Sequence, residues 1–271
     1  MVGHFECIGF EPVTVRESVP RALGGAPRVA QAPGGSMHYL ARDASGAAIA
    51  FHMQGDAVEC VTPFFVPDAG LHRWHVHTSA PAIDAECIHC SGADCDIVDA
   101  QGELLTRTGV QFAIFRPYEA WLTESRTFDV EVVGFAHTMS TFATKEEFDE
   151  GQRELWTDED GKEATGRDGR PLRYADNVFM PEGLFSAGPI DMRARAISLC
   201  AGRITHARRL VNGWTNGPFW HVTLETFPGP LDIVAADVEP TVGHLALVRA
   251  WLVGRPTTPP PRPSWLRRLF N

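Results

Sequence analysis

Residues Arg193–Arg255 constrain the fold most, because they read as a compact series of β-strands separated by strong turns. The run Ala194–Leu210 has β-favouring side chains around Gly202, and a glycine allows a long strand to bend or bulge. Two Asn-Gly pairs follow within the next few residues, and both residue types tolerate the positive φ angles of tight turns. Phe219–Thr226 then alternates apolar and polar residues, which is typical of a half-buried strand.

The order of these strands predicts a small antiparallel barrel. Leu231–Ala236 and Val242–Val253 are apolar enough to supply the closing strands. A long bent strand, a hairpin and closing strands in this order resemble the OB-fold, whose five-stranded Greek-key barrel commonly binds oligonucleotides or oligosaccharides on one face. The resemblance depends on pattern rather than on a signature motif. An open antiparallel sheet or a sandwich is the alternative.

A short pattern that occurs twice extends this interpretation to the whole chain. Trp-His-Val stands at 74–76 and at 220–222, and Asp-Ile-Val follows at 96–98 and at 232–234. We therefore expect a mainly β protein of two tandem small antiparallel barrels, OB-like, or two barrel-like sheets, with one or two short helices. The expected divisions are an N-terminal β module with a cysteine-containing insertion (1–125), a connecting strand and helix (126–156), a polar linker (157–178), a C-terminal OB-like module (179–255), and a proline-rich spacer with a basic aromatic tail (256–271).

Composition narrows the class of protein and its location. None of the apolar runs in the 271 residues approaches the ~20 needed to cross a bilayer, so we expect no transmembrane segment. The first residues lack the pattern of a secretion signal, and six cysteines without one favour a cytoplasmic protein with reduced thiols. The net charge of −10 is uneven: residues 191–271 hold ten arginines and five acidic residues, a net +5, which leaves −15 for residues 1–190.

Three cysteines and a histidine form one candidate site. Cys87, Cys90 and Cys95 have the spacing C-x2-C-x4-C, and His75 precedes them on a predicted strand. Zinc prefers four Cys or His ligands in a tetrahedron, so these residues are candidates for a structural zinc. Against zinc, the chain has no second C-x2-C pair, and free thiols in a reduced loop are the alternative. Otherwise we expect no cofactor.

Basic and aromatic residues in the last third form a second candidate site. Single-stranded nucleic acid is bound by cations that contact phosphates and by exposed rings that stack on bases. The candidates for this role, or for binding another ligand, are Arg203, Arg208, Arg209, Trp214, Phe219 and Arg249. The alternative is that the rings belong to the core and the arginines are solvated or pair with the acidic half.

The C-terminus forms a third candidate. Its prolines exclude a helix or a central strand in the spacer, because proline lacks the amide donor and fixes φ. Beyond the spacer, a short basic and apolar stretch is a candidate for docking on the chain itself, on a partner protein or on an anionic surface. Its members are Trp265, Leu266, Arg267, Arg268, Leu269 and Phe270.

No catalytic or nucleotide-binding signature stands out in the sequence. We therefore expect a binding or scaffold protein rather than an enzyme, with an unknown protein or ligand as its partner. Two alternatives stay open. One is a single-stranded nucleic-acid-binding protein, and the other is an enzyme whose site is assembled from residues scattered along the chain.

Overall fold

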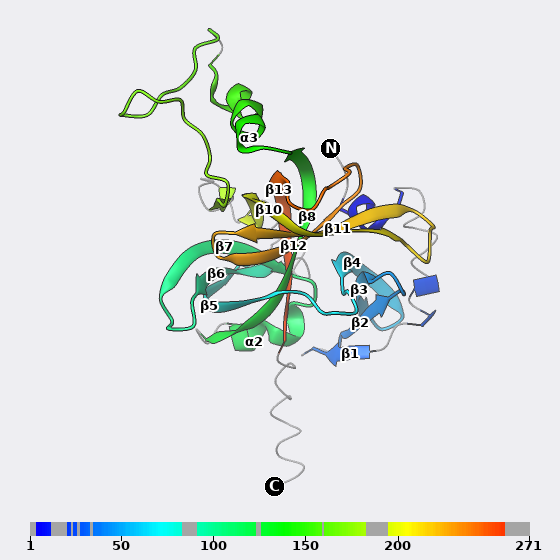
Figure 1. Cartoon of the computed structure of the whole chain (residues 1–271). Coiled ribbons are helices and arrows are strands. Elements are labelled where there is room, and N and C mark those ends of the chain that lie inside the picture. Colours follow the sequence, from blue (N-terminus) through cyan, green and yellow to red (C-terminus); the bar gives the residue numbers. More distant parts are fainter. Residues whose placement is uncertain are drawn as a thin grey trace.

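The computed structural model describes residues 4–11, 21–22, 24–25, 28–32, 35–82, 91–122, 126–158, 160–182 and 195–257. These parts are mainly β, as expected, with short helices between the strands (Figure 1). The strands are β1 (Arg28–Gln31), β2 (Met37–Arg42), β3 (Ala47–Gln54), β4 (Ala57–Phe65), β5 (Arg73–Ala82), β6 (Gly92–Val98), β7 (Leu104–Phe112), β8 (Thr127–Phe142), β9 (Phe179–Met180), β10 (Ile197–Val211), β11 (Pro218–Thr226), β12 (Gly229–Ala235) and β13 (Leu245–Pro256). The helices are η1 (Glu6–Ile8), η3 (Arg116–Tyr118), α2 (Glu119–Leu122), α3 (Lys145–Gly151) and η4 (Arg153–Trp156).

Strands β1 to β4 form an antiparallel sheet in chain order, and the other nine strands form a second sheet. The second sheet is organised around β8 and β13, which pair antiparallel from Leu245 opposite Phe142 to Pro256 opposite Val130. Two rings of paired strands share this ladder. The C-terminal ring is β13-β10-β11-β12-β8, and the N-terminal ring is β8-β5-β6-β7-β13.

Each shared strand changes partner along one edge. β8 pairs with β5 up to Glu131 and with β12 from Val133, whereas β13 pairs with β10 up to Trp251 and with β7 from Val253. Gly134 and Gly254 lie beside these changes of partner. A Cβ added to Gly134 would lie 2.5 Å from Ile233 Cδ1, and one added to Gly254 would lie 2.7 Å from Val110 Cγ1. The missing side chains therefore leave room for side chains of the neighbouring strands, Ile233 on β12 and Val110 on β7.

Both faces of the shared ladder are buried along Val132–Ala136 of β8 and Ala250–Gly254 of β13. One face contributes residues such as Val130, Val132 and Leu252 to a core that continues through both rings. The other face contributes Phe135 and Trp251 to a second core, which includes side chains of β2 to β4 and of η1. A strand buried on both faces reads as a nearly continuous apolar run, which explains the sequences of β8 and β13.

The pairing does not confirm two tandem OB-like barrels. The strands of residues 195–257 do not close a ring by themselves, because β8 lies between β12 and β13. The two Trp-His-Val triplets also do not mark equivalent strands. Trp74 lies on β5, the first strand of its three-strand meander, whereas Trp220 lies on β11, the second strand of its own. In the strand order, β5, β6, β7 and β8 correspond to β10, β11, β12 and β13.

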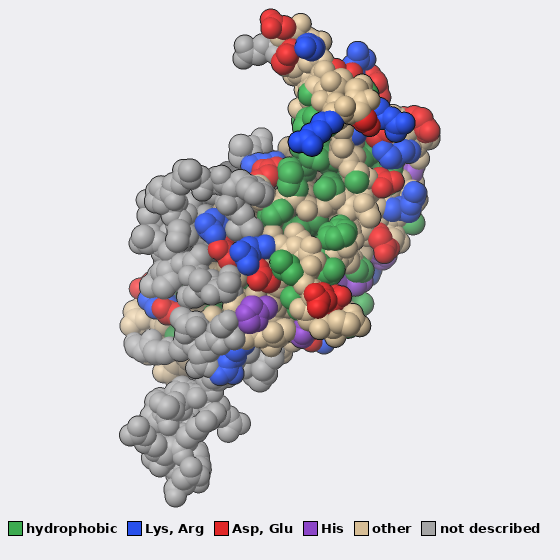
Figure 2. Space-filling model, turned by 90° about the vertical axis from the view of Figure 1, so that its left-hand side faces the viewer, with side chains coloured by type: hydrophobic (Ala, Val, Ile, Leu, Met, Phe, Trp, Pro, Cys, Tyr) green, Lys and Arg blue, Asp and Glu red, His purple; other side chains and the backbone are tan. Residues whose placement is uncertain are grey.

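The helix α3 lies within the predicted connecting strand and helix (126–156) and begins with a capping box. The Thr144 side chain accepts a hydrogen bond from the Glu147 amide at 3.2 Å, and the Glu147 carboxylate accepts one from the Ala143 amide at 2.8 Å. Beyond η4, the described part of the predicted polar linker projects from the body as an arm (Figures 1 and 2). Isolated bridges join Thr157 to Glu163 and Thr165 to Pro171 within it. In the part of the chain that the structure describes, no helix is long and apolar enough to cross a membrane.

We predict that both rings unfold in one transition, because they share two strands and one core. Ile97 and Ile233 are buried in the interiors of the N-terminal and C-terminal rings. Ile97→Ala and Ile233→Ala should each lower the free energy of unfolding by about 2–5 kcal/mol and shift the same transition in urea. Val211→Ala, at an exposed position, is the control. Two separate transitions, each moved by only one of the core variants, would instead show independent modules.

Candidate functional site

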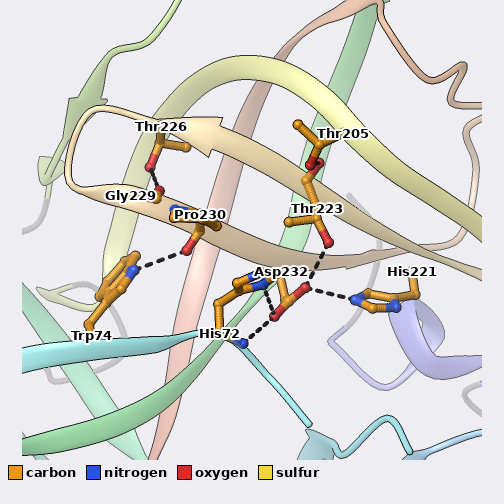
Figure 3. A network of polar contacts seen from close by, with 9 residues as sticks. All are labelled: His72, Trp74, Thr205, His221, Thr223, Thr226, Gly229, Pro230 and Asp232. Carbon is orange, nitrogen blue, oxygen red and sulfur yellow. Dashed lines mark hydrogen bonds and ion pairs between the residues drawn. The ribbon is translucent and has the colours of Figure 1, made fainter. Parts of the chain in front are cut away.

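A buried carboxylate on β12 joins distant parts of the fold. Asp232 interrupts the apolar sequence of β12 and is almost fully buried. Its Oδ2 accepts hydrogen bonds from the backbone amide of His72 at 2.8 Å and from the His72 imidazole Nδ1 at 3.0 Å. Its Oδ1 accepts hydrogen bonds from His221 Nε2 and from Thr223 Oγ1, both at 2.9 Å (Figure 3). The carboxylate therefore ties β11 and β12 to the segment that precedes β5.

The two histidines differ in their access to solvent. His221 is buried on β11, with its ring centroid 4.8 Å from that of Phe65 and 5.3 Å from that of His206. The His72 side chain is about half exposed. One imidazole of the network is thus enclosed between strands, and the other can meet a small molecule from solvent.

Hydrogen bonding keeps Asp232 ionised. Burial by itself raises the pKa of this carboxyl. The hydrogen bond from His221, the backbone hydrogen bond from His72 and the charges of both imidazoles lower it, and the net pKa lies below the ordinary value. An ionised carboxylate only accepts hydrogen bonds, so the proton lies on Nδ1 in His72 and on Nε2 in His221.

A second candidate site is an open groove of about 820 Å³ at one end of the C-terminal ring. The segment after β12 crosses this end and reaches β10, where Gly243 N bonds Ile204 O and Ile204 N bonds His244 O. The groove lies between this segment and the β10–β11 hairpin. Its lining consists of Arg209, Pro218, Phe219, Trp220 and residues 236–241.

The groove offers charges of both signs beside an indole ring. Arg209, Asp237 and Glu239 are exposed, and Trp220 is half buried against the ring interior. Among the described residues, no hydrogen bond or ion pair occupies the side chains of these three charged residues. A guanidinium, two carboxylates and an aromatic face are therefore available to a ligand.

The structure spreads the predicted ligand-binding residues apart. Arg203 donates to the Gly243 carbonyl at 2.6 Å, and Arg249 donates to Glu182 Oε2 at 2.7 Å. Arg208 and Arg209 are both exposed, but they are consecutive on β10 and so point to opposite faces. Of the predicted residues, only Arg209 and Phe219 line the groove.

The two predicted stacking rings are buried to different degrees. Phe219 is fully buried, and Trp214 is partly buried, with its ring centroid 5.9 Å from that of Phe10. The face in Figure 2 also carries acidic and basic side chains interspersed rather than a field of one sign. Phe219 therefore offers no exposed ring for stacking on a base of single-stranded nucleic acid.

The two described members of the predicted zinc set point to opposite faces of the sheet. Cys95 points into the N-terminal ring, where burial raises the pKa of its thiol. His75 lies on the outer face of the neighbouring strand, and its Nδ1 lies 2.8 Å from Asp129 Oδ1. Among the described residues, no group of three or more Cys, His, Asp or Glu side chains is arranged to hold a metal ion. Cys87 and Cys90 lie outside the described residues, as does the predicted docking stretch at 265–270.

Sequence reasoning missed Asp232 and His72. The available signal was an acidic residue between Leu231 and Ile233 in an apolar strand, because a buried carboxylate needs partners.

Comparisons of the chain with protein-family models, with curated proteins and with solved structures found no match.

We predict that Asp232→Asn destabilises the fold in a pH-dependent way. At pH 7 the variant should lose about 2–4 kcal/mol of unfolding free energy, because charge-assisted hydrogen bonds to a buried group are lost. The pKa of Asp232 is lowered in the folded state, so its stabilisation is complete above the ordinary carboxyl pKa of about 4 and is lost as the pH falls through the lower folded value.

Urea unfolding at pH 7 and pH 3 measures this effect. Asp129→Asn is the matched control, because Asp129 also contacts a histidine but is about half exposed. The control should cost less than about 1 kcal/mol at either pH. An equal cost of Asp232→Asn at both pH values would contradict the assignment.

Proposed function

We propose that this protein is a binding protein whose ligand occupies the groove at the end of the C-terminal ring. The observation that carries the proposal is that Arg209, Asp237 and Glu239 share this groove with Trp220 and are not paired with one another. The volume of about 820 Å³ falls within the range of small-ligand sites, roughly 300–1,000 Å³.

The arrangement of charges favours a zwitterionic ligand with an apolar group. A carboxylate of the ligand would pair with the guanidinium of Arg209, and an ammonium would pair with Asp237 or Glu239. The indole of Trp220 offers a surface for an apolar or aromatic side chain. Short peptides and related amino-acid derivatives carry all three features, so we propose them as the ligand class.

The rival functions have less support from the described residues. A nucleic-acid-binding role would need the buried ring of Phe219 and the engaged side chains of Arg203 and Arg249. The cytoplasmic location and a scaffold role with a protein partner stay predictions from the sequence. The correspondence of the two meanders supports a proposal that the rings derive from one repeated unit, in which the C-terminal copy carries the groove.

We predict that zwitterionic dipeptides with an aromatic residue bind the groove and that Arg209 is needed for binding. Calorimetric titration with Ala-Phe should give binding that is weakened about tenfold or more by Arg209→Ala, because one charge-assisted pair is lost. Arg208→Ala is the matched control, because Arg208 is equally exposed on the same strand but lies outside the groove lining.

Blocked peptides separate the two charges of the ligand. N-acetyl-Ala-Phe should lose the contact with the carboxylates, and Ala-Phe-amide should lose the contact with Arg209. Asp237→Asn combined with Glu239→Gln should weaken Ala-Phe but not N-acetyl-Ala-Phe. Equal binding of all three peptides, or equal effects of the Arg208 and Arg209 variants, would refute the proposal.

A further inference from the structure

Two histidines near the start of β5 provide an internal comparison. His72 and His75 each place Nδ1 close to an aspartate oxygen, at 3.0 Å from Asp232 and 2.8 Å from Asp129. Their side chains are 48% and 47% exposed. The carboxylates differ, because the Asp232 side chain is 2% exposed and the Asp129 side chain is 49% exposed.

We propose that His72 is a nucleophilic centre that, with Asp232, accepts acyl groups from small activated esters and releases them to water. This activity is separate from ligand binding in the groove. The proposed site is of the kind left open by the sequence, an enzyme site assembled from residues scattered along the chain, since 160 positions separate His72 from Asp232. None of the residues that line the groove belongs to the Asp232 network, so the two sites use different side chains.

The geometry fixes the tautomer that a nucleophile needs. The ionised carboxylate of Asp232 accepts the Nδ1 proton of His72, so the lone pair of the neutral ring lies on Nε2. Nε2 is on the far side of the ring from Asp232, and within the described part of the chain no group bonds it. Solvent therefore reaches the basic nitrogen while the carboxylate holds the other.

Burial of the carboxylate distinguishes His72 from His75. When Nε2 attacks, positive charge develops on the imidazole. A carboxylate at low local dielectric stabilises that charge more strongly than one surrounded by water. The backbone amide of His72, His221 and Thr223 hold Asp232 in place, so little reorganisation accompanies the reaction (Figure 3). His221 and Thr223 are positioning residues in this scheme.

The reaction with an ester is balanced without a further cofactor. The Nε2 lone pair forms a bond to the carbonyl carbon, the bond from that carbon to the ester oxygen breaks, and the alkoxide or phenolate leaves with the electron pair. The Nδ1 proton stays in its hydrogen bond to Asp232. Water then attacks the acyl carbon, the carbon–Nε2 bond breaks with its electrons returning to Nε2, and a carboxylic acid is released, while the second proton of the water passes through solvent to the departed alkoxide or phenolate.

Competitive acylation of the whole protein tests the proposal. The full chain is treated with substoichiometric diethyl pyrocarbonate at pH 7, and peptide mass spectrometry follows modification of His72 and His75 in the same sample. His72 should react about tenfold faster or more, because the buried carboxylate stabilises the positive charge that develops on its ring. Asp129→Asn should leave the His72 rate unchanged, and Asp232→Asn should remove its advantage.

Two further measurements keep the proposal falsifiable if Asp232→Asn does not fold. Nitrogen-15 NMR of the wild-type protein should show His72 protonated on Nδ1 in its neutral form. The hydrolysis of p-nitrophenyl acetate should fall to the rate of free imidazole in His72→Gln and stay unchanged in His75→Gln. Equal acylation of the two histidines, a proton on Nε2, or unchanged hydrolysis in His72→Gln would overturn the proposal.

Discussion

The antiparallel ladder between β8 and β13 is the interaction on which the rest of the structure depends. It supplies two of the five strands of each ring. The three-strand meanders β5-β6-β7 and β10-β11-β12 form closed rings only because both of their outer strands pair with this ladder. One face of the ladder joins the interiors of both rings, and the other face carries the second core against β2 to β4. The stretch with both faces buried, Val132–Ala136 of β8 and Ala250–Gly254 of β13, contains only apolar residues and glycine, and its two glycines leave room for side chains of the adjacent strands β12 and β7.

Local features of this fold were predictable from the sequence. The turn chemistry after β10 and the alternation in β11 each depend on a few neighbouring residues, and the predicted elements are present. The ring closures were not predictable in this way. The parallel pairings of β12 with β8 and of β7 with β13 join strands that are far apart in the chain. The repeated Trp-His-Val triplet was misleading, because strand alternation alone places similar residues on non-equivalent strands.

The candidate sites show the same limit. Arg209 was identified by its residue type, but its companions Asp237 and Glu239 lie in a segment that becomes relevant only when it crosses the end of the ring. Asp232 has a local signal, namely a carboxylate in an apolar strand, yet the identity of its donors depends on how the segment before β5 meets β12. Residue types can therefore indicate that a partner must exist, while only the topology determines which residue it is.

The groove and the Asp232 network use charge in two different ways. In the groove, Arg209, Asp237 and Glu239 are exposed, so each remains well solvated until a ligand replaces water. In the network, Asp232 has already lost its water and is stabilised by fixed donors, so its charge acts on His72 with little screening. Exposed charges suit reversible binding because pairing them costs little desolvation. A buried, fully hydrogen-bonded charge suits orientation of a reactive group, because its donors hold it in one position before any substrate arrives.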